Sequence, residues 1–220
     1  MRVSAASIAD LFSGLSILAA AAYGFALLTK PVGALRTAIK AAAVACIAAV
    51  SYVLGGPWLL TLPLLLSAAG DAFLARSPKP WLPVGLAAFL LAQLLYVALF
   101  AHNNLRLGVL AEFPRWVLVA GAIGVAVAVL RALWTDLGRM REAVVIYVTV
   151  VLMMVVMAFT LPWSRSAAMI GAVLFMTSDA ILAFRLFRGG GPNITADLAI
   201  WWFYWAAQAL IARAFLHAAG

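Results

Sequence analysis

Two aspartates, Asp71 and Asp179, lie inside apolar stretches of the sequence. Each is followed by Ala, one apolar residue, Leu and Ala, and the two positions lie 108 residues apart. An ionisable side chain inside a membrane helix is costly and usually faces a protein interior or a wet cavity. A pair of such carboxyls suits general acid/base chemistry. The alternative is structural: each is an acid near an interface, paired with a basic side chain or bound by Ser67 or Ser178.

Six further polar residues fall inside apolar segments, and we expect them to line a binding site with the aspartates. They are Lys40, Gln93, Tyr96, Tyr147, Tyr204 and Gln208. Gln93 and Tyr96 are spaced i, i+3, so they share one face of a helix. Tyr204 and Gln208, spaced i, i+4, do the same. The alternative for the glutamines is hydrogen bonding between helices, and for the tyrosines it is core packing or an interfacial belt.

Other catalytic and metal-binding patterns are missing from the sequence. The two histidines, His102 and His217, fall at the outer ends of their segments, and no His-x-x-His or Glu-x-x-His occurs. This argues against a zinc site and against a Ser-His-Asp triad. No nucleophile elbow, phosphate loop or dinucleotide signature is present, and the single cysteine, Cys46, rules out an intrachain disulfide. We expect neither a metal nor a cofactor.

The elements that position these residues are predicted to be membrane helices. Of the 220 residues, 67% are hydrophobic and 10% charged, whereas soluble domains are roughly 45–50% apolar and about 25% charged. A span takes about 20 apolar residues, so the length allows eight. We predict an all-α, polytopic membrane bundle of eight transmembrane helices in a single domain, 1–220. The expected spans are 8–28, 38–54, 57–75, 82–101, 115–133, 143–161, 167–184 and 198–216.

Basic residues are unequally divided between the two sets of alternating loops. One set holds ten: Lys30, Arg36, Lys40, Arg76, Lys79, Arg131, Arg139, Arg141, Arg185 and Arg188. The other holds five: Arg2, Arg106, Arg115, Arg165 and Arg213. Because Lys and Arg are enriched in cytoplasmic loops, the first set is predicted to be cytoplasmic and both termini non-cytoplasmic. The net charge of +8 then reflects membrane orientation rather than binding of nucleic acid.

The chain shows signs of an internal repeat of four helices. Besides the matching aspartate motifs, the only glutamines, Gln93 and Gln208, lie 115 residues apart, and so do the two histidines. A unit with an even number of spans keeps its topology, so half-repeats near 1–105 and 106–220 would be parallel repeats. Asp71 and Asp179 would then face the same leaflet and could share one pocket. Coincidence in a chain rich in alanine and leucine is the alternative.

Four short motifs follow one another in a set order along the chain. They are Leu66-Ser-Ala-Ala-Gly-Asp71, Gln93-Leu-Leu-Tyr96, Gly171-Ala-Val-Leu-Phe-Met-Thr-Ser-Asp179 and Tyr204-Trp-Ala-Ala-Gln208. Their order and the eight-span layout resemble the YhhN-like family of integral membrane proteins, the lysoplasmalogenases. Two positions depart from the family pattern: Ala41 stands where a proline is frequent, and Gln93 where a histidine is frequent. The second departure bears on proton handling and head-group contact, and so on the substrate.

The resemblance implies hydrolysis of the vinyl ether bond of a lysoplasmalogen, a lysophospholipid-type amphiphile, to a fatty aldehyde and a glycerophospho-head group. One aspartate would protonate the alkene and the other would stabilise the oxocarbenium ion and activate water; either can be the acid. Lys40 and nearby arginines could hold the phosphate, and Tyr204 and Gln208 could orient water or the ether oxygen. We expect an integral protein of the bacterial inner membrane, surrounded by membrane lipids.

A small-solute or lipid transporter is the competing prediction, because parallel repeats and buried acids suit it as well. The spans, however, lack the paired Gly/Pro interruptions typical of discontinuous binding helices. A structural or signalling protein is a third alternative, and it predicts that both aspartates are replaceable. The sequence leaves the oligomeric state, the head group and the chain length of the substrate open.

We also expect Trp201, Trp202 and Trp205 to form an aromatic belt at the membrane interface.

Overall fold

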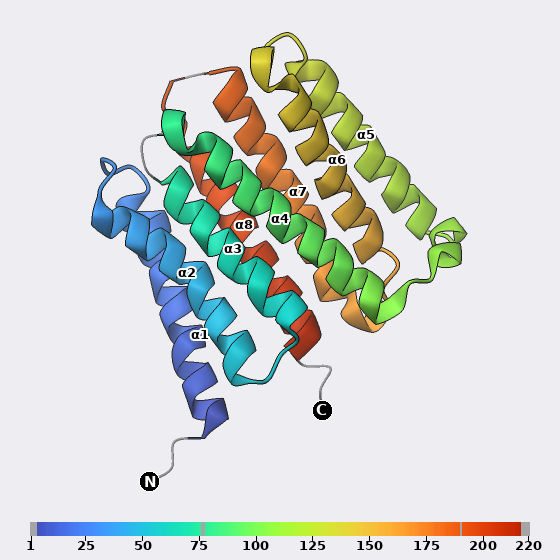
Figure 1. The fold of residues 1–220 in the computed structure, drawn as a ribbon, viewed down its shortest axis with the longest axis horizontal. Coiled ribbons are helices and arrows are strands. Elements are labelled where there is room, and N and C mark those ends of the chain that lie inside the picture. The colour runs from blue at the N-terminus through green and yellow to red at the C-terminus, as the bar shows by residue number, and fades with distance from the viewer. Residues whose placement is uncertain (1–3, 76–77, 190, 217–220) are drawn as a thin grey trace. The chain divides into compact units, whose positions relative to one another are not determined.

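The computed structural model describes residues 4–75, 78–189 and 191–216, and within these ranges it is all-helical (Figure 1). Its α-helices are α1 (Ala5–Ala21), α2 (Ala34–Val53), α3 (Trp58–Leu74), α4 (Pro78–Asn104), α5 (Arg115–Leu133), α6 (Arg141–Ala158), α7 (Ser166–Phe187) and α8 (Ile194–Leu216). A π-helical segment, Ala22–Leu27, continues α1. Each expected span coincides with one of these helices, which confirms the all-α prediction. Arg2, Arg76 and His217, used above for orientation and repeat, lie outside the described residues.

Six of the described helical segments are long and apolar enough to cross a membrane. They are Ala5–Leu27, Ala34–Val53, Trp81–Asn103, Arg115–Leu133, Gly138–Ala158 and Trp163–Phe187. Helix α3 is apolar but has only 17 residues, about 26 Å of helix against a hydrocarbon core of about 30 Å. Helix α8 is long enough, but its tryptophans, Gln208 and Arg213 lower its mean hydropathy. Six spans are therefore supported by length and composition, and eight remain a prediction.

The chain forms two compact units, Met1–Tyr96 with Ala212–Gly220, and Val97–Ile211. In the first unit α1 packs on α2 and α2 on α3 (Figure 1). Helices α2 and α3 are antiparallel, since the Ser51 and Thr61 hydroxyls bond at 2.8 Å near the turn that joins them. That turn needs a glycine at Gly55, where φ is +69°. Pro57 then precedes the first turn of α3 as its N-cap residue.

Close contacts at glycines fix the alignment of α3 and α4. A Cβ on Gly70 would lie 2.7 Å from the Phe89 ring, and a Cβ on Gly85 would lie 2.7 Å from the Leu74 side chain. As residue 70 meets 89 and residue 74 meets 85, the two helices run antiparallel in a defined register. Small residues at such contacts let helix backbones approach closely in membranes.

In the second unit α5 packs on α6 and α6 on α7 (Figure 1). Val129, Leu133, Leu137 and Val144 form an apolar cluster there. Helices α7 and α8 are antiparallel and very close: a Cβ on Gly171 would lie 2.8 Å from the carbonyl oxygen of Ala207.

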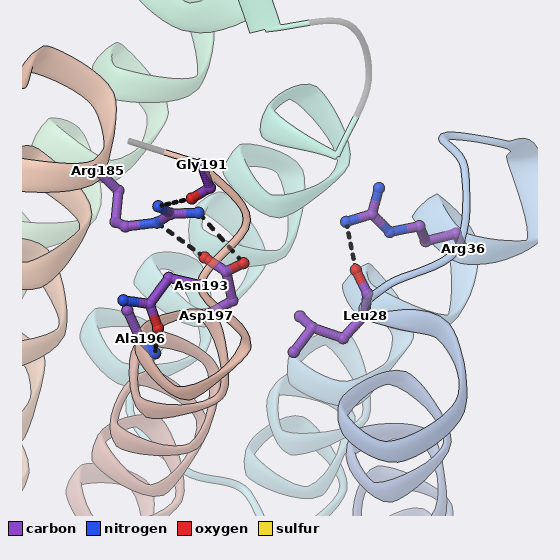
Figure 2. Close-up of polar contacts among 7 residues, drawn as sticks. All are labelled: Leu28, Arg36, Arg185, Gly191, Asn193, Ala196 and Asp197. Atoms are coloured by element: carbon purple, nitrogen blue, oxygen red, sulfur yellow. Dashed lines mark hydrogen bonds and ion pairs between the residues drawn. The ribbon is translucent and has the colours of Figure 1, made fainter. Parts of the chain in front are cut away.

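Polar contacts close the connection between α7 and α8, as Figure 2 shows. The Arg185 guanidinium bonds the Asp197 carboxylate through Nε at 3.1 Å and donates to the Gly191 carbonyl at 2.9 Å. Asn193 caps α8, its Oδ1 accepting from the Ala196 amide at 3.0 Å. A cation in the last turn of α7 and an anion in the first turn of α8 also complement the helix dipoles.

Candidate functional site

Asp71 and Lys40 form a buried ion pair in the first unit. The Lys40 ammonium lies 2.9 Å from Oδ1 of Asp71, and the two side chains are 17% and 2% exposed. Asp71 stands one turn before the end of α3, and Lys40 stands two turns into α2, so the antiparallel pairing brings them to one level. A buried ion pair contributes little net stability compared with apolar packing. Net stability alone therefore gives no reason for keeping these two charges inside the unit.

Tyr23 belongs to the same cluster, although the sequence pattern did not point to it. Its ring is buried, with the Lys40 ammonium and the Arg36 guanidinium each 5.8 Å from the ring centre. Cations at this distance from an aromatic face are attracted by its quadrupole. Tyr23 lies in the π-helical segment, and such segments are frequent at functional sites. A tyrosine inside the apolar second half of the first span was the available signal.

Asp179 and Tyr147 form the corresponding contact in the second unit. The Tyr147 hydroxyl donates to Oδ2 of Asp179 at 2.7 Å, and both side chains are half-buried. The expected grouping of Tyr147 with an aspartate is thus present within this unit. Ser178, suggested above as a partner for an aspartate, instead donates to the Ile200 carbonyl at 2.9 Å. That bond places Asp179 of α7 close to the level of residue 200 on α8.

Tyr204 and Gln208 are buried on α8, at increasing distance from the level of Asp179. Counted from Ile200, Tyr204 lies about one turn and Gln208 about two turns along the helix. The Tyr204 ring meets Phe175 edge-on, with ring centres 5.5 Å apart. Trp201, expected in an interfacial belt, is only 2% exposed and lies 6.1 Å from the Tyr204 ring. The belt prediction is wrong for Trp201, because it faces the protein interior beside Tyr204.

Gln93 and Tyr96 are fully buried on α4. Neither polar atom of the Gln93 amide has a hydrogen-bond partner among the described residues, and the same holds for the Ser67 hydroxyl on α3. Buried polar side chains usually have a partner, so each exception calls for an explanation. The suggestion that Ser67 binds Asp71 is therefore wrong. Hydrogen bonding between described helices, the alternative given for the glutamines, is wrong for Gln93.

Each aspartate contacts the helix that precedes its own in the chain. Asp71, on α3, contacts a residue of the preceding helix α2, and Asp179, on α7, contacts a residue of the preceding helix α6. One carboxylate is held by an ammonium and the other by a phenol. Such a pair of environments can support different protonation states in two like groups. That the aspartates face one another across a single pocket stays a prediction.

Comparison with known proteins agrees with the order of these motifs. The sequence pattern of the YhhN family matches residues 35–215. A lysoplasmalogenase from Mycobacterium bovis is 34% identical over 191 residues, which cover 82% of this chain and 70% of that protein. A lysoplasmalogenase from Mycobacterium tuberculosis is similar to the same extent. No solved structure is significantly similar. Because the family pattern covers helices α2 to α8 and both aspartates, the chain belongs to the YhhN family.

Proposed function

We propose that the protein is a membrane-embedded hydrolase that cleaves the vinyl ether bond of lysoplasmalogens to a fatty aldehyde and a glycerophospho-head group. The observation that carries the proposal is the buried Lys40–Asp71 pair together with the Tyr147–Asp179 contact. The mycobacterial relatives named lysoplasmalogenase support the substrate class. Both contacts lie in helices of an apolar chain, where a single-chain lipid is the natural substrate.

The reaction needs a proton donor and a negative charge near the substrate. Vinyl ether hydrolysis starts with proton transfer to the alkene carbon remote from the oxygen, and the product is an oxocarbenium ion. Lys40 pairs with Asp71 as a carboxylate, a form suited to stabilising that cation. Asp179 accepts from the neutral phenol of Tyr147, which leaves it able to carry the proton. We therefore assign proton donation to Asp179 and stabilisation of the cation to Asp71, the division of labour used by glycosidases.

Head-group binding is assigned to the basic residues of α2. Arg36 lies one turn before Lys40, nearer the start of the helix, so it is closer to a membrane surface. Its guanidinium donates to the Leu28 carbonyl at 3.2 Å (Figure 2), and its buried Nε has no partner among the described residues. A phosphate oxygen is a suitable acceptor for that group. Tyr204, Gln208, Gln93 and Tyr96 complete the proposed substrate site, with Tyr204 and Gln208 orienting the ether oxygen.

The membrane arrangement extends the same proposal. We propose eight spans, two parallel four-helix repeats, non-cytoplasmic termini and a bacterial inner-membrane location. The ten-to-five division of basic residues between loops supports the orientation. An alkaline phosphatase fused to the C-terminus should be active, because that enzyme matures only outside the cytoplasm. A fusion active only as a cytoplasmic reporter would overturn the orientation and leave the hydrolase proposal intact.

An assay on purified protein in detergent tests the activity directly. A lysoplasmalogen should yield aldehyde at a rate proportional to enzyme, and the matching 1-acyl lysophospholipid, which has an ester in place of the vinyl ether, should not. The transporter alternative predicts uptake into vesicles without turnover. The relatives named as lysoplasmalogenases do not favour that alternative. Uptake without aldehyde release would overturn the hydrolase proposal.

A further inference from the structure

Two buried polar side chains of the first unit have no role in the proton transfer assigned above. Ser67 and Gln93 are each 0% exposed. The Ser67 Oγ and both polar atoms of the Gln93 amide lack a hydrogen-bond partner among the described residues. Leaving a buried donor or acceptor without a partner destabilises a protein. A ligand that bonds to these side chains would remove that cost.

The register of α3 and α4 puts Ser67 and Gln93 at the same level. The two helices are antiparallel, with Gly70 against Phe89. From Gly70, Ser67 lies three residues back along α3, about 4.5 Å along the helix axis. From Phe89, Gln93 lies four residues on along α4, about 6 Å along its axis. Because the helices are antiparallel, both steps go in the same direction. Both residues lie about one turn further from the start of α2 than the Lys40–Asp71 pair.

The chemistry of the two side chains defines the ligand. A hydroxyl and a primary amide each donate and accept hydrogen bonds, so together they match a small ligand with an O–H group. A water molecule needs two to four polar partners in such a place. Ser67 Oγ, Gln93 Oε1 and Gln93 Nε2 supply three.

We infer that Ser67 and Gln93 form a buried hydroxyl-binding site that holds the water consumed in vinyl ether hydrolysis. The inference rests on the proposed function. After a proton has added to the alkene, the oxygen of this water forms a bond to the carbon next to the ether oxygen. The surplus proton of the water passes to a carboxylate, and the resulting hemiacetal breaks its bond to the glycerol oxygen. One water is consumed, and one aldehyde and one alcohol are released.

Depth favours water over the other possible source of a hydroxyl, the free sn-2 hydroxyl of the lipid. That hydroxyl lies between the phosphate and the vinyl ether. If the phosphate lies at Arg36 and the reacting bond at Asp71, the sn-2 hydroxyl lies between Arg36 and Asp71. Ser67 and Gln93 lie beyond Asp71, where a lyso lipid has its tail. A water held there would approach the vinyl ether from the tail side.

Methanol competition tests the inference. Methanol can add to the oxocarbenium ion in place of water and gives a mixed acetal that keeps the head group. In 1 M methanol the wild type should give almost only aldehyde, because its water is already bound. Gln93→Leu and Ser67→Ala should slow aldehyde release about tenfold or more and raise the acetal-to-aldehyde ratio by a similar factor. Gln93→His keeps a donor and an acceptor and should preserve the wild-type ratio.

Two controls separate the possible failures. Ser51→Ala removes a fully buried serine of the same unit, bonded at 2.8 Å to Thr61, and should leave the acetal ratio unchanged. Methylating the sn-2 hydroxyl of the substrate should slow the wild type and Gln93→Leu by the same factor. If methylation slows the wild type but not Gln93→Leu, the site binds the lipid hydroxyl, and the water assignment is overturned. Wild-type ratios in Gln93→Leu and Ser67→Ala also overturn it, whereas a wild type that releases no aldehyde overturns the proposed function instead.

Discussion

The two units solve the same problem, an aspartate inside an apolar helix, in different ways. Asp71 lies 2.9 Å from the Lys40 ammonium and is 2% exposed, whereas Asp179 accepts a hydrogen bond of 2.7 Å from Tyr147 and is half-buried. In both units the partner comes from the preceding helix. The chemistry of the partner and the burial of the carboxyl both differ. The two carboxyls thus have unlike environments, which is the condition for unlike roles.

Close helix contacts at glycines also differ between the units. In the first unit Gly70 and Gly85 of the α3–α4 pair meet side-chain atoms of the facing helix. In the second, Gly171 of α7 meets a backbone oxygen of α8. A side chain can rotate away from an added methyl group, but a helical carbonyl cannot. Gly171 should therefore be more sensitive to an added methyl group than Gly70 or Gly85.

The largest expected effect is on turnover, from replacing either aspartate by asparagine. Losing a general acid typically costs about 10²–10⁴-fold, so Asp179→Asn should fall in that range. Asp71→Asn should lose less, since a neutral amide still offers a dipole to the cation but cannot donate a proton to carbon. Initial rates of aldehyde release measure both, with the exposed Asp10→Asn as control. The reverse order would break the role assignment, and near wild-type rates in both would make the aspartates structural.

Removing the Lys40 ammonium should give the next largest effect, a loss in the free energy of unfolding. Lys40→Met leaves the buried Asp71 carboxylate without its ammonium, and breaking a buried pair in this way costs about 3–5 kcal/mol. Arg185→Met is a matched control, because the Arg185–Asp197 pair is 23% and 37% exposed. Such a pair is worth about 0–1 kcal/mol. Unfolding of both variants in the same detergent measures the difference.

The double variant Lys40→Met/Asp71→Asn separates charge from packing. With no carboxylate left to pair, it should recover most of the stability lost in Lys40→Met while staying inactive. If the double variant is as unstable as Lys40→Met alone, the cost comes from lost packing of the lysine stem, and the ion pair is not what distinguishes the first unit.

Glycine substitutions should give intermediate losses and should rank these two helix contacts. Adding a methyl group to a packed core costs about 1–3 kcal/mol. Gly171→Ala should reach the upper part of that range because its Cβ would lie 2.8 Å from the Ala207 carbonyl oxygen. Gly85→Ala should fall in the lower part, since the Leu74 side chain can move. Equal unfolding midpoints for the two variants would remove this difference between the units.

The smallest expected effect comes from the phenol of the second unit. Tyr147→Phe keeps the ring and removes one hydrogen bond, a loss of about 0.5–1.5 kcal/mol in stability. Aldehyde release should fall by about tenfold or less, since Tyr147 orients Asp179 without supplying the proton. Denaturation midpoints and initial rates give the two values. A loss as large as that of Asp179→Asn would place Tyr147 itself in the proton transfer.

Much of the fold could be read from the sequence because membrane helices depend on a strong, local property. Runs of about 20 apolar residues interrupted by Gly, Pro and charged clusters have few structural alternatives. All eight expected segments are helical, including α3 with Pro63 inside it. Asp71 and Asp179 were equally visible, since a carboxyl is conspicuous in such a run. Membership of the YhhN family was readable from the order of short motifs.

Only the tertiary structure decided which side chain each of these residues meets. Partners depend on helix register, and register is set by contacts such as Gly70 with Phe89, which one helix alone does not reveal. In the structure Asp71 meets an ammonium and Asp179 meets a phenol. Trp201 faces the protein interior, and Tyr23 lies beside the Lys40 ammonium. Ser67 and Gln93 are buried without described partners. Composition and periodicity determine which groups enter the membrane, whereas packing between helices determines what chemistry they can do.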